Sequence, residues 1–368
     1  ASWLRPLSFD VSPHQRTMRS VPRRQVLLRV AGVLAALPGI ARAASVEFAT
    51  PSSETGCTFA VAKIRKAQLI EPPAEGSCRT SSGSSAIFQA ASLSKPIVAT
   101  LALKLMLRGK LDLDQPVSEV LPDGYVHRQN LFALHESPVV DIVPRDVLKK
   151  LTVRNLLSHT SGLPNWSSKA PLRLSIEPGA GWRYSGEGYV LLQHVLHKLT
   201  GMPLNALASA ELFEPLGLQD TAFKLTEHVA HSLVPGRSAS GQIRQLRFPH
   251  EIAASSLYTT ASDYGRFIVA TLKDQRLLSL ITESSVSVPG APGVYWGLGW
   301  AIEQSSEHRV IWHWGNNPGF RALAMADLIS NDAVVVLAAT ESGMPQAKAA
   351  VRQILPGAHL GLDLDLVQ

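Results

Sequence analysis

Apolar residues follow a strand-like pattern at the start of the chain and a helical pattern soon after it. Residues 57–64 (CTFAVAKI) and 85–90 (SAIFQA) are short runs rich in β-branched, aromatic and other apolar side chains, which predict two strands. From Ser92 the apolar positions recur at helical spacing as far as Gly109, where we expect the helix to end.

Strand-like runs return near the C-terminus. Three apolar runs separated by Asn, Asp, Pro and Gly residues predict strands at 309–314, 322–328 and 333–339. Residues 346–354 follow with the spacing of a final helix. Between the two ends, the chain shows mostly helical patterns joined by long loops, including a helix from about 187 to 199.

This order predicts an α+β fold. We expect an antiparallel sheet built from N- and C-terminal segments, about 57–90 and 293–355, and flanked by helices. A mostly helical subdomain is inserted at about 110–270, and a cleft is expected where the two parts meet. Residues 44–368 then form one domain.

The formal net charge of +6 comes from the N-terminal segment. Residues 1–43 hold seven arginines and one acidic residue, whereas residues 44–368 carry 28 basic and 28 acidic residues. Nucleic-acid binding normally requires a basic face. We therefore expect no nucleic-acid partner.

Residues 1–43 are predicted to be a signal peptide. Paired arginines at 23–24, which resemble a twin-arginine signal, precede an apolar run at 30–40 and small residues at 41 and 43. A bilayer span needs about 20 apolar residues, so we expect no integral membrane segment after cleavage. The mature protein is then periplasmic or secreted. Alternatively, residues 23–42 form the first helix of the domain.

The chain has two cysteines, Cys57 and Cys78. In an exported protein they can form one disulfide, which would close a short loop near the first strands. Two free thiols are the alternative.

Several common signatures are absent from the sequence: Gly-x-Ser-x-Gly, His-Glu-x-x-His and the glycine-rich phosphate loops. Two histidine pairs, at 194/197 and 228/231, have no accompanying third ligand and are interpreted as solvated helix or loop residues. We expect neither a metal site nor a cofactor.

Ser92-Leu93-Ser94-Lys95 is the only Ser-x-x-Lys sequence in the chain, and it lies where a predicted strand ends and a helix begins. Positions i and i+3 share a helix face, so the Lys95 amine can reach the Ser92 hydroxyl. The N-terminal end of a helix favours an oxyanion and a lysine of lowered pKa. A weak hydroxyl nucleophile needs such an adjacent base. A plain N-cap serine with a solvated lysine is the alternative.

Two further motifs place potentially reactive or binding residues next to glycine. In Tyr184-Ser185-Gly186 a tyrosine on a turn before a helix can be aimed into a cleft; a core aromatic is the alternative. In His313-Trp314-Gly315 the glycine permits close approach of a ligand to a strand edge; an ordinary strand exit is the alternative.

Together these motifs resemble those of the penicillin-recognising serine hydrolases, specifically the class C β-lactamase-like family, over about residues 57–355. Three further stretches are similar to family hallmarks: 156–163 (LLSHTSGL), 257–263 (LYTTASD) and 297–300 (GLGW).

The resemblance implies roles for particular residues. Ser92 would be the acylated nucleophile, Lys95 would help take its proton, and Tyr184 would be a second proton carrier that helps activate the deacylating water. His313 and Gly315 fall on the family's Lys-Thr-Gly strand. The backbone N–H groups of Ser92 and Asn316 would form the oxyanion hole.

Two positions depart from the family pattern. Gly186 replaces the asparagine of Tyr-x-Asn, which weakens the case for efficient β-lactam turnover unless Glu187 or another group substitutes. His313 replaces the lysine of Lys-Thr-Gly, and a mostly neutral histidine is a poorer anchor for a substrate carboxylate unless Arg321 supplies the charge.

We therefore expect an exported serine hydrolase that forms an acyl-enzyme with a small-molecule acyl substrate. That substrate is an ester, a D-amino-acid amide or peptide, or a β-lactam, and the departures favour the esterase or peptidase slightly. The alternative is a non-catalytic or slowly deacylating protein of the same fold that binds penicillin or cell-wall fragments.

Overall fold

The computed structural model describes residues 58–70, 86–133, 139–305, 308–365 and 367. They belong to the compact unit Phe48–Gln368, while a second unit, Ala1–Glu47, lies outside the described residues. The predicted signal peptide and both cysteines also lie outside them, so the predictions about export and a disulfide stay predictions.

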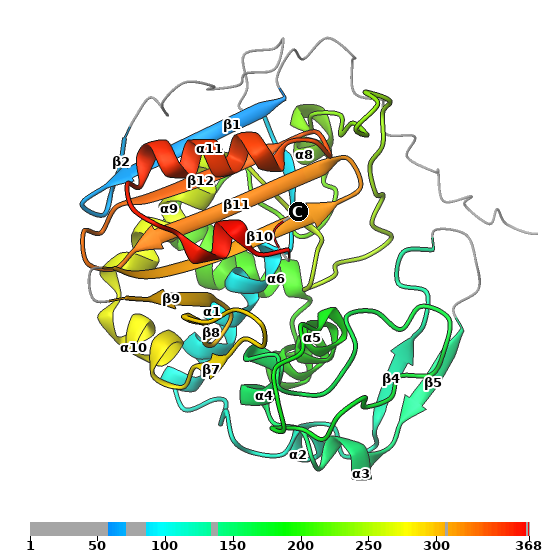
Figure 1. The fold of residues 1–368 in the computed structure, drawn as a ribbon. Coiled ribbons are helices and arrows are strands. Elements are labelled where there is room, and N and C mark those ends of the chain that lie inside the picture. The colour runs from blue at the N-terminus through cyan, green and yellow to red at the C-terminus, as the bar shows by residue number, and fades with distance from the viewer. Residues whose placement is uncertain (1–57, 71–85, 134–138, 306–307, 366, 368) are drawn as a thin grey trace, which may run out of the picture. The chain divides into compact units, whose positions relative to one another are not determined.

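An eight-stranded antiparallel sheet joins the two ends of the described chain (Figure 1). In spatial order its strands are β2 (Gln68–Leu69), β1 (Phe59–Arg65), β12 (Ala333–Ala338), β11 (Phe320–Asp327), β10 (Arg309–Asn317), β9 (Ala301–Gln304), β8 (Val294–Trp296) and β7 (Val286–Ser287). β1 pairs directly with β12, with Phe59 opposite Ala338. This confirms the predicted α+β fold, in which N- and C-terminal segments share one antiparallel sheet.

β12 is apolar on both faces because helices cover both sides of the sheet. Its alternate side chains point to opposite faces. Val334 and Val336 pack in the cluster that contains α11 (Met344–Ile354), and Val335 packs in the cluster that contains α9 (Ala261–Lys273). Figure 1 shows α11 across the near face of β11 and β12.

The strand predicted at 85–90 forms β3 (Phe88–Ala91), but it does not join the large sheet. β3 pairs with β6 (Leu257–Thr259) in a separate two-stranded sheet and packs against β10 and β11. All four of its residues are buried. We expected this strand in the large sheet. It lies instead against β10 and β11, where all its side chains are buried.

The remaining helices lie mainly between β3 and the C-terminal strands in the sequence. They are α1 (Ser94–Leu107), α2 (Val117–Val120), α3 (Arg145–Leu148), α4 (Val153–Leu157), α5 (Gly186–Thr200), α6 (Leu204–Ala208), the π-helical turn η1 (Ser209–Phe213), α7 (Glu214–Leu216), α8 (Glu227–Ser232), α10 (Gln275–Glu283) and the C-terminal 3-10 turn η2 (Leu360–Asp363). α1 is buried along almost its whole length and packs against α5, α6 and α10.

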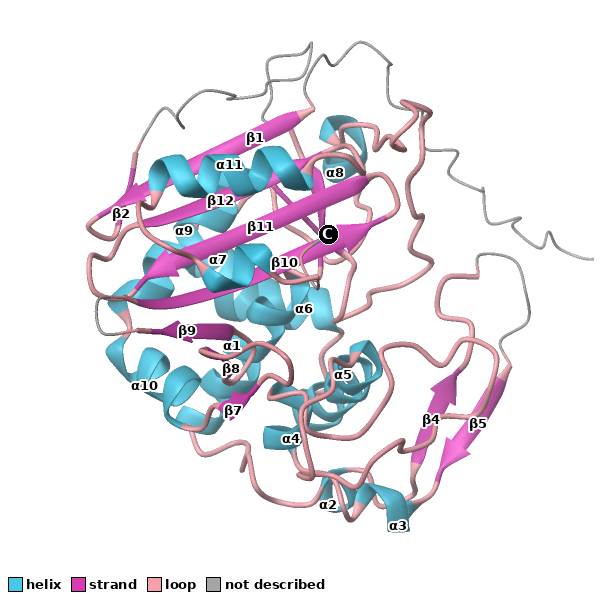
Figure 2. Ribbon diagram, viewed as in Figure 1, coloured by secondary structure: helices cyan, strands magenta, loops and turns pink. Residues whose placement is uncertain are grey.

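The inserted region also contains a hairpin that the sequence did not predict. Strands β4 (Tyr125–Arg128) and β5 (Val140–Val143) pair in register, with Tyr125 opposite Val143 (Figure 2). In β4 buried and exposed side chains alternate, so Tyr125 and His127 point inward. No helix among the described residues is both long and apolar enough to cross a membrane.

Candidate active site

Ser92 lies in the tight turn between β3 and α1. Ala91 has a left-handed backbone, with φ of 51°, and the Lys95 amide donates to the Ser92 carbonyl oxygen at 3.0 Å. Helix α1 begins at Ser94, and its N-cap residue is Leu93, without a side-chain cap. Ser92 is therefore not a plain N-cap serine, and its hydroxyl is available for another role.

Lys95 is buried beneath Ser92. Its side-chain amine donates to the Ser92 hydroxyl oxygen at 3.0 Å and to the Ala254 carbonyl oxygen at 2.8 Å. The residue is only 1% exposed, and burial lowers the pKa of the amine to about 7. A large fraction of the amine is therefore unprotonated at neutral pH and can take a proton from the hydroxyl.

Tyr184 lies beside Ser92 and Lys95 and directly precedes Ser185, the N-cap residue of α5. The Lys95 amine lies 4.8 Å from the centre of the Tyr184 ring. The Tyr184 hydroxyl is buried and makes no well-formed hydrogen bond to another described residue. Burial raises the pKa of the Tyr184 hydroxyl. The nearby Ser92 hydroxyl lowers this pKa, but by less than burial raises it. The structure thus brings together the three residues that the resemblance singled out.

His159 supports this arrangement, although the sequence analysis gave it no role. Its ring centre is 4.4 Å from that of Tyr184, and its Nδ1 accepts a hydrogen bond from the Ser185 amide at 3.2 Å. Burial, helped by the charge of Lys95, lowers the pKa of His159 well below its usual range, so the ring is neutral. The stretch 156–163 had drawn attention to this residue, but its left-handed backbone, with φ of 57°, appears only in the structure.

Gly315 lets β10 approach β3, the strand that ends one residue before Ser92. A Cβ atom at this position would lie 2.4 Å from the Ala90 carbonyl oxygen and 3.1 Å from the Ala91 Cβ. The protein's own backbone thus approaches Gly315 closely at Ala90, and the predicted approach of a ligand to this strand edge stays a prediction. Gly315 helps to set the position of Ser92 relative to Asn316.

His313 and Arg321 do not bring positive charge to the site. His313 is fully buried, its Nδ1 donates to the Trp314 carbonyl oxygen at 2.8 Å, and burial lowers its pKa to about 3. The Arg321 guanidinium donates to the backbone oxygens of Asn317 and Phe320. Neither residue lines the pocket at Ser92.

At Gly186 the segment Asn165–Trp166 occupies the space that a side chain would need. The Gly186 amide donates to Asn165 Oδ1 at 3.0 Å, and a Cβ would lie 2.7 Å from the Asn165 carbonyl oxygen. Glu187 does not replace the missing asparagine, because its carboxylate accepts from the Ser167 amide and lies 3.3 Å from His127 Nε2. Asn165 itself lines the pocket at Ser92, as do two further asparagines.

The pocket at Ser92 has a volume of about 650 Å³. Its lining is mostly aromatic, apolar and neutral polar: Ser92, Phe132, Asn165, Trp166, Tyr184, Leu246, Ser255, Trp314, Asn316, Asn317 and Pro318. The Ser255 hydroxyl is buried without a hydrogen-bond partner among the described residues. None of these lining residues is cationic, and no cluster of potential metal ligands occurs in the described part of the chain.

The sequence of the chain is similar to those of known proteins. The chain is 34% identical to esterase EstB of Burkholderia gladioli over 170 residues, which cover 38% of this chain and 39% of the esterase. It is 24% identical to the D-alanyl-D-alanine-carboxypeptidase/endopeptidase AmpH of Escherichia coli over 273 residues, which cover 64% of this chain and 66% of AmpH. The chain thus spans less than two thirds of the length of either relative.

The fold is also shared with solved structures. The octameric penicillin-binding protein homologue from Pyrococcus abyssi superposes with a TM-score of 0.63 at 20% identity, over 81% of this chain and 72% of that one. The family model described as Beta-lactamase matches residues 74–359. Because that match spans most of the sequence, this chain belongs to the beta-lactamase family.

Proposed function

We propose that this chain is a serine hydrolase that forms an acyl-enzyme on Ser92 with esters or amides that are apolar and uncharged around the scissile bond. The observation that carries the proposal is the 3.0 Å contact between the Ser92 hydroxyl and a buried lysine whose pKa is about 7. A serine so placed has its base already within hydrogen-bond reach.

The reaction follows from the arrangement of these groups. The unprotonated Lys95 amine takes the hydroxyl proton as Ser92 Oγ attacks the substrate carbonyl carbon. The backbone N–H groups of Ser92 and Asn316 would stabilise the negative oxygen, and loss of one such donor typically costs about 100-fold to 1,000-fold in rate. The proton passes through Tyr184 to the leaving alcohol or amine, which departs. Water, deprotonated by the same pair, then attacks the carbonyl carbon of the acyl-enzyme. The bond from that carbon to Ser92 Oγ breaks, Oγ takes the proton back from the pair, and the acid is released.

The lining of the pocket supports the choice of substrate class. Phe132, Trp166 and Trp314 present apolar surface beside Ser92, and no lysine, arginine or histidine is among the described lining residues. A substrate carboxylate placed there would lose its hydration without gaining an ion pair. A neutral acyl group would instead bury apolar surface at about 25 cal/mol per Å².

A mass-spectrometric experiment tests the proposal. The purified full chain is mixed with p-nitrophenyl butyrate, quenched in acid within seconds and weighed intact, while p-nitrophenol release is followed by absorbance. We expect a butyryl adduct and steady turnover in the wild type, and neither in Ser92→Ala. Ser167→Ala, which removes a hydroxyl outside the pocket, is the matched control. Full turnover by Ser92→Ala would overturn the proposal.

A parallel reaction with a penicillin separates the remaining alternatives. We expect little or no adduct, because a penicillin carries a carboxylate and the pocket has no cation to receive it. A lasting penicillin adduct on Ser92 would instead favour the slowly deacylating binding protein. The proposed periplasmic or secreted location rests on the predicted signal peptide in residues 1–43.

A further inference from the structure

A second pocket, of about 830 Å³, lies beside the hairpin β4–β5 and helix α5. It shares no lining residue with the pocket at Ser92. Residues 131 and 133 line the second pocket, while Phe132 between them lines the first. Phe132 also contacts Trp166 and Phe248, with ring centres 5.1 and 6.3 Å away. Phe132 therefore lies between residues that line the other pocket, and its ring packs against two further aromatic rings.

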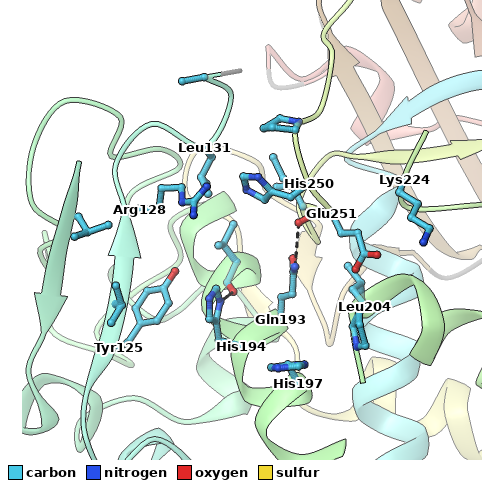
Figure 3. Close-up of a pocket in the computed structure, with 17 residues that line it drawn as sticks. Tyr125, Arg128, Leu131, Gln193, His194, His197, Leu204, Lys224, His250 and Glu251 are labelled. Carbon is cyan, nitrogen blue, oxygen red and sulfur yellow. Dashed lines mark hydrogen bonds between the residues drawn. The ribbon is translucent and has the colours of Figure 1, made fainter. Parts of the chain in front are cut away.

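The second pocket is rich in groups that are or can become positive. They come from four separate parts of the chain and are Arg128, His194, His197, Lys224 and His250. Figure 3 shows Arg128, His194 and His250 together towards one end of the pocket and Lys224 towards the other. Arg128 is exposed to solvent, and neither it nor Lys224 forms an ion pair with a described residue.

Glu251 is the only acidic residue among those lining this pocket, and its carboxylate is already engaged. One carboxylate oxygen accepts the Asn205 amide at 3.1 Å, at the start of α6. The Glu251 backbone oxygen accepts from the Gln193 side chain at 3.0 Å (Figure 3). None of the five basic groups of this pocket forms an ion pair with a described carboxylate, although the Glu251 carboxylate lies in the same pocket.

Two histidines of this pocket, His194 and His250, have lowered pKa values, first because they are buried and then because positive groups lie near them. Burial lowers the pKa of His250, and Arg128 and His194 lower it further. Burial also lowers the pKa of His194, and the neighbouring His197, Arg128 and His127 lower it further. A hydrogen bond to the Val190 backbone oxygen raises this pKa, but only in part. An anion between these groups would offset their mutual repulsion and favour their protonated forms.

We propose that this pocket binds the carboxylate or phosphate group of a small-molecule ligand, held by Arg128 together with His194 and His250. Arginine and protonated histidine both donate charge-assisted hydrogen bonds to such oxyanions, which are about twice as strong as neutral ones. The pocket is large enough for more than the anionic group alone, so the rest of the ligand would lie against apolar lining residues such as Leu131 and Leu204. This site stands apart from the proposed hydrolysis at Ser92.

The pH dependence of binding follows from the charged groups around His194. Its neighbours are Tyr125 and Arg128 on β4, His127 on the same strand with its ion-pair partners Asp141 and Glu187, His197 on α5, and His250 and Glu251, which also line the pocket. His194 and His250 line the pocket, and both gain positive charge as the pH falls. The affinity for an anion of fixed charge should therefore rise as the pH falls.

Isothermal titration calorimetry on the full chain tests the proposal. Inorganic sulfate is the probe, because its charge does not change between about pH 6 and pH 8, and succinate is the carboxylate counterpart. We expect saturable one-site binding that is several-fold tighter at about pH 6 than at about pH 8. Arg128→Gln should weaken binding about tenfold, as expected for loss of a charged hydrogen-bond donor. His194→Gln should reduce the pH dependence.

Two control variants keep the outcome interpretable. Arg276→Gln removes an exposed arginine on α10, away from the pocket, and should leave binding unchanged. Ser92→Ala should also bind sulfate normally, whether or not the chain hydrolyses esters. Absence of saturable binding, or equal weakening by Arg276→Gln and Arg128→Gln, would overturn the proposal.

Kinetics then distinguish two sources of the anionic group. If the pocket holds the far end of a substrate bound at Ser92, saturating sulfate raises the KM for mono-p-nitrophenyl glutarate but not for p-nitrophenyl butyrate. If the pocket holds a separate anion, sulfate leaves both KM values unchanged. Once calorimetry has shown saturable binding, either pattern agrees with an anion site away from Ser92, whereas inhibition of both esters in direct competition would place sulfate at Ser92 and contradict it.

Discussion

The substitution Gly315→Ala tests whether the contact between β10 and β3 sets the position of the nucleophile. The added methyl carbon would lie 2.4 Å from the Ala90 carbonyl oxygen, whereas ordinary contacts begin near 3.4 Å. The oxygen belongs to the backbone and cannot move away by a side-chain rotation. β3 and β10 must therefore separate by about 1 Å, and Ser92 follows Ala90 by two residues.

Such a shift has a calculable consequence. A misplacement of about 1 Å between reacting groups typically costs about 100-fold in rate. We therefore expect kcat/KM for p-nitrophenyl butyrate to fall about 100-fold. Overpacking of this kind also costs about 1–3 kcal/mol, so the free energy of unfolding should decrease by that amount.

The matched control is Gly181→Ala. It adds the same methyl group where the nearest atom is 3.9 Å away, so activity and stability should change little. Both variants are assayed for ester hydrolysis and for urea-induced unfolding. If Gly315→Ala keeps its kcat/KM within about threefold of the wild type while remaining folded, the contact does not position Ser92 and the reasoning fails.

Three further changes give separate tests. Because burial lowers the pKa of Lys95 to about 7, kcat/KM should rise with pH to a plateau above that value, and Lys95→Met should lower it at least about 100-fold; a flat wild-type profile would contradict the role as base. Burial lowers the pKa of His127, but the carboxylates of Glu187 and Asp141 outweigh burial, so the pKa is raised overall. The ion pairs of protonated His127 therefore stabilise the fold fully in acid, and this stabilisation is lost as the pH rises through the raised pKa. His127→Gln should cost about 3–5 kcal/mol, measured by urea unfolding, and should remove this pH dependence; an unchanged slope with pH would refute it. Gly186→Asn should destabilise the fold, because its Cβ meets the Asn165 carbonyl oxygen at 2.7 Å; a melting temperature equal to the wild type would show that the loop yields freely.

Much of the architecture could be predicted because its signals are local. The apolar run of β12, AVVVLA, has no polar alternation, which indicates burial on both faces. Helix α5 ends at Gly201, whose φ of 70° is the left-handed conformation that glycine favours at a helix end. Such features depend on residues a few positions apart, so the sequence alone carries them.

The hairpin β4–β5 and the partner of β3 were not predicted, because their signals are not local. β4 shows a period-two pattern over only four residues, too short to stand out from a loop. β3 pairs with β6, more than 160 residues later in the chain, and no pattern within β3 itself names so distant a partner.

For the candidate site, the sequence alone determined which residues have suitable chemistry. Ser92 and Lys95 were selected by residue type and spacing, because a hydroxyl and an amine three residues apart lie close together in a helical turn. Tyr184 was selected by its resemblance to the family motif. Only the tertiary structure decided their environment. Burial from all sides lowers the pKa of Lys95, and burial keeps His313 neutral. Desolvation and charge act through space, so these properties depend on distant segments that folding brings together.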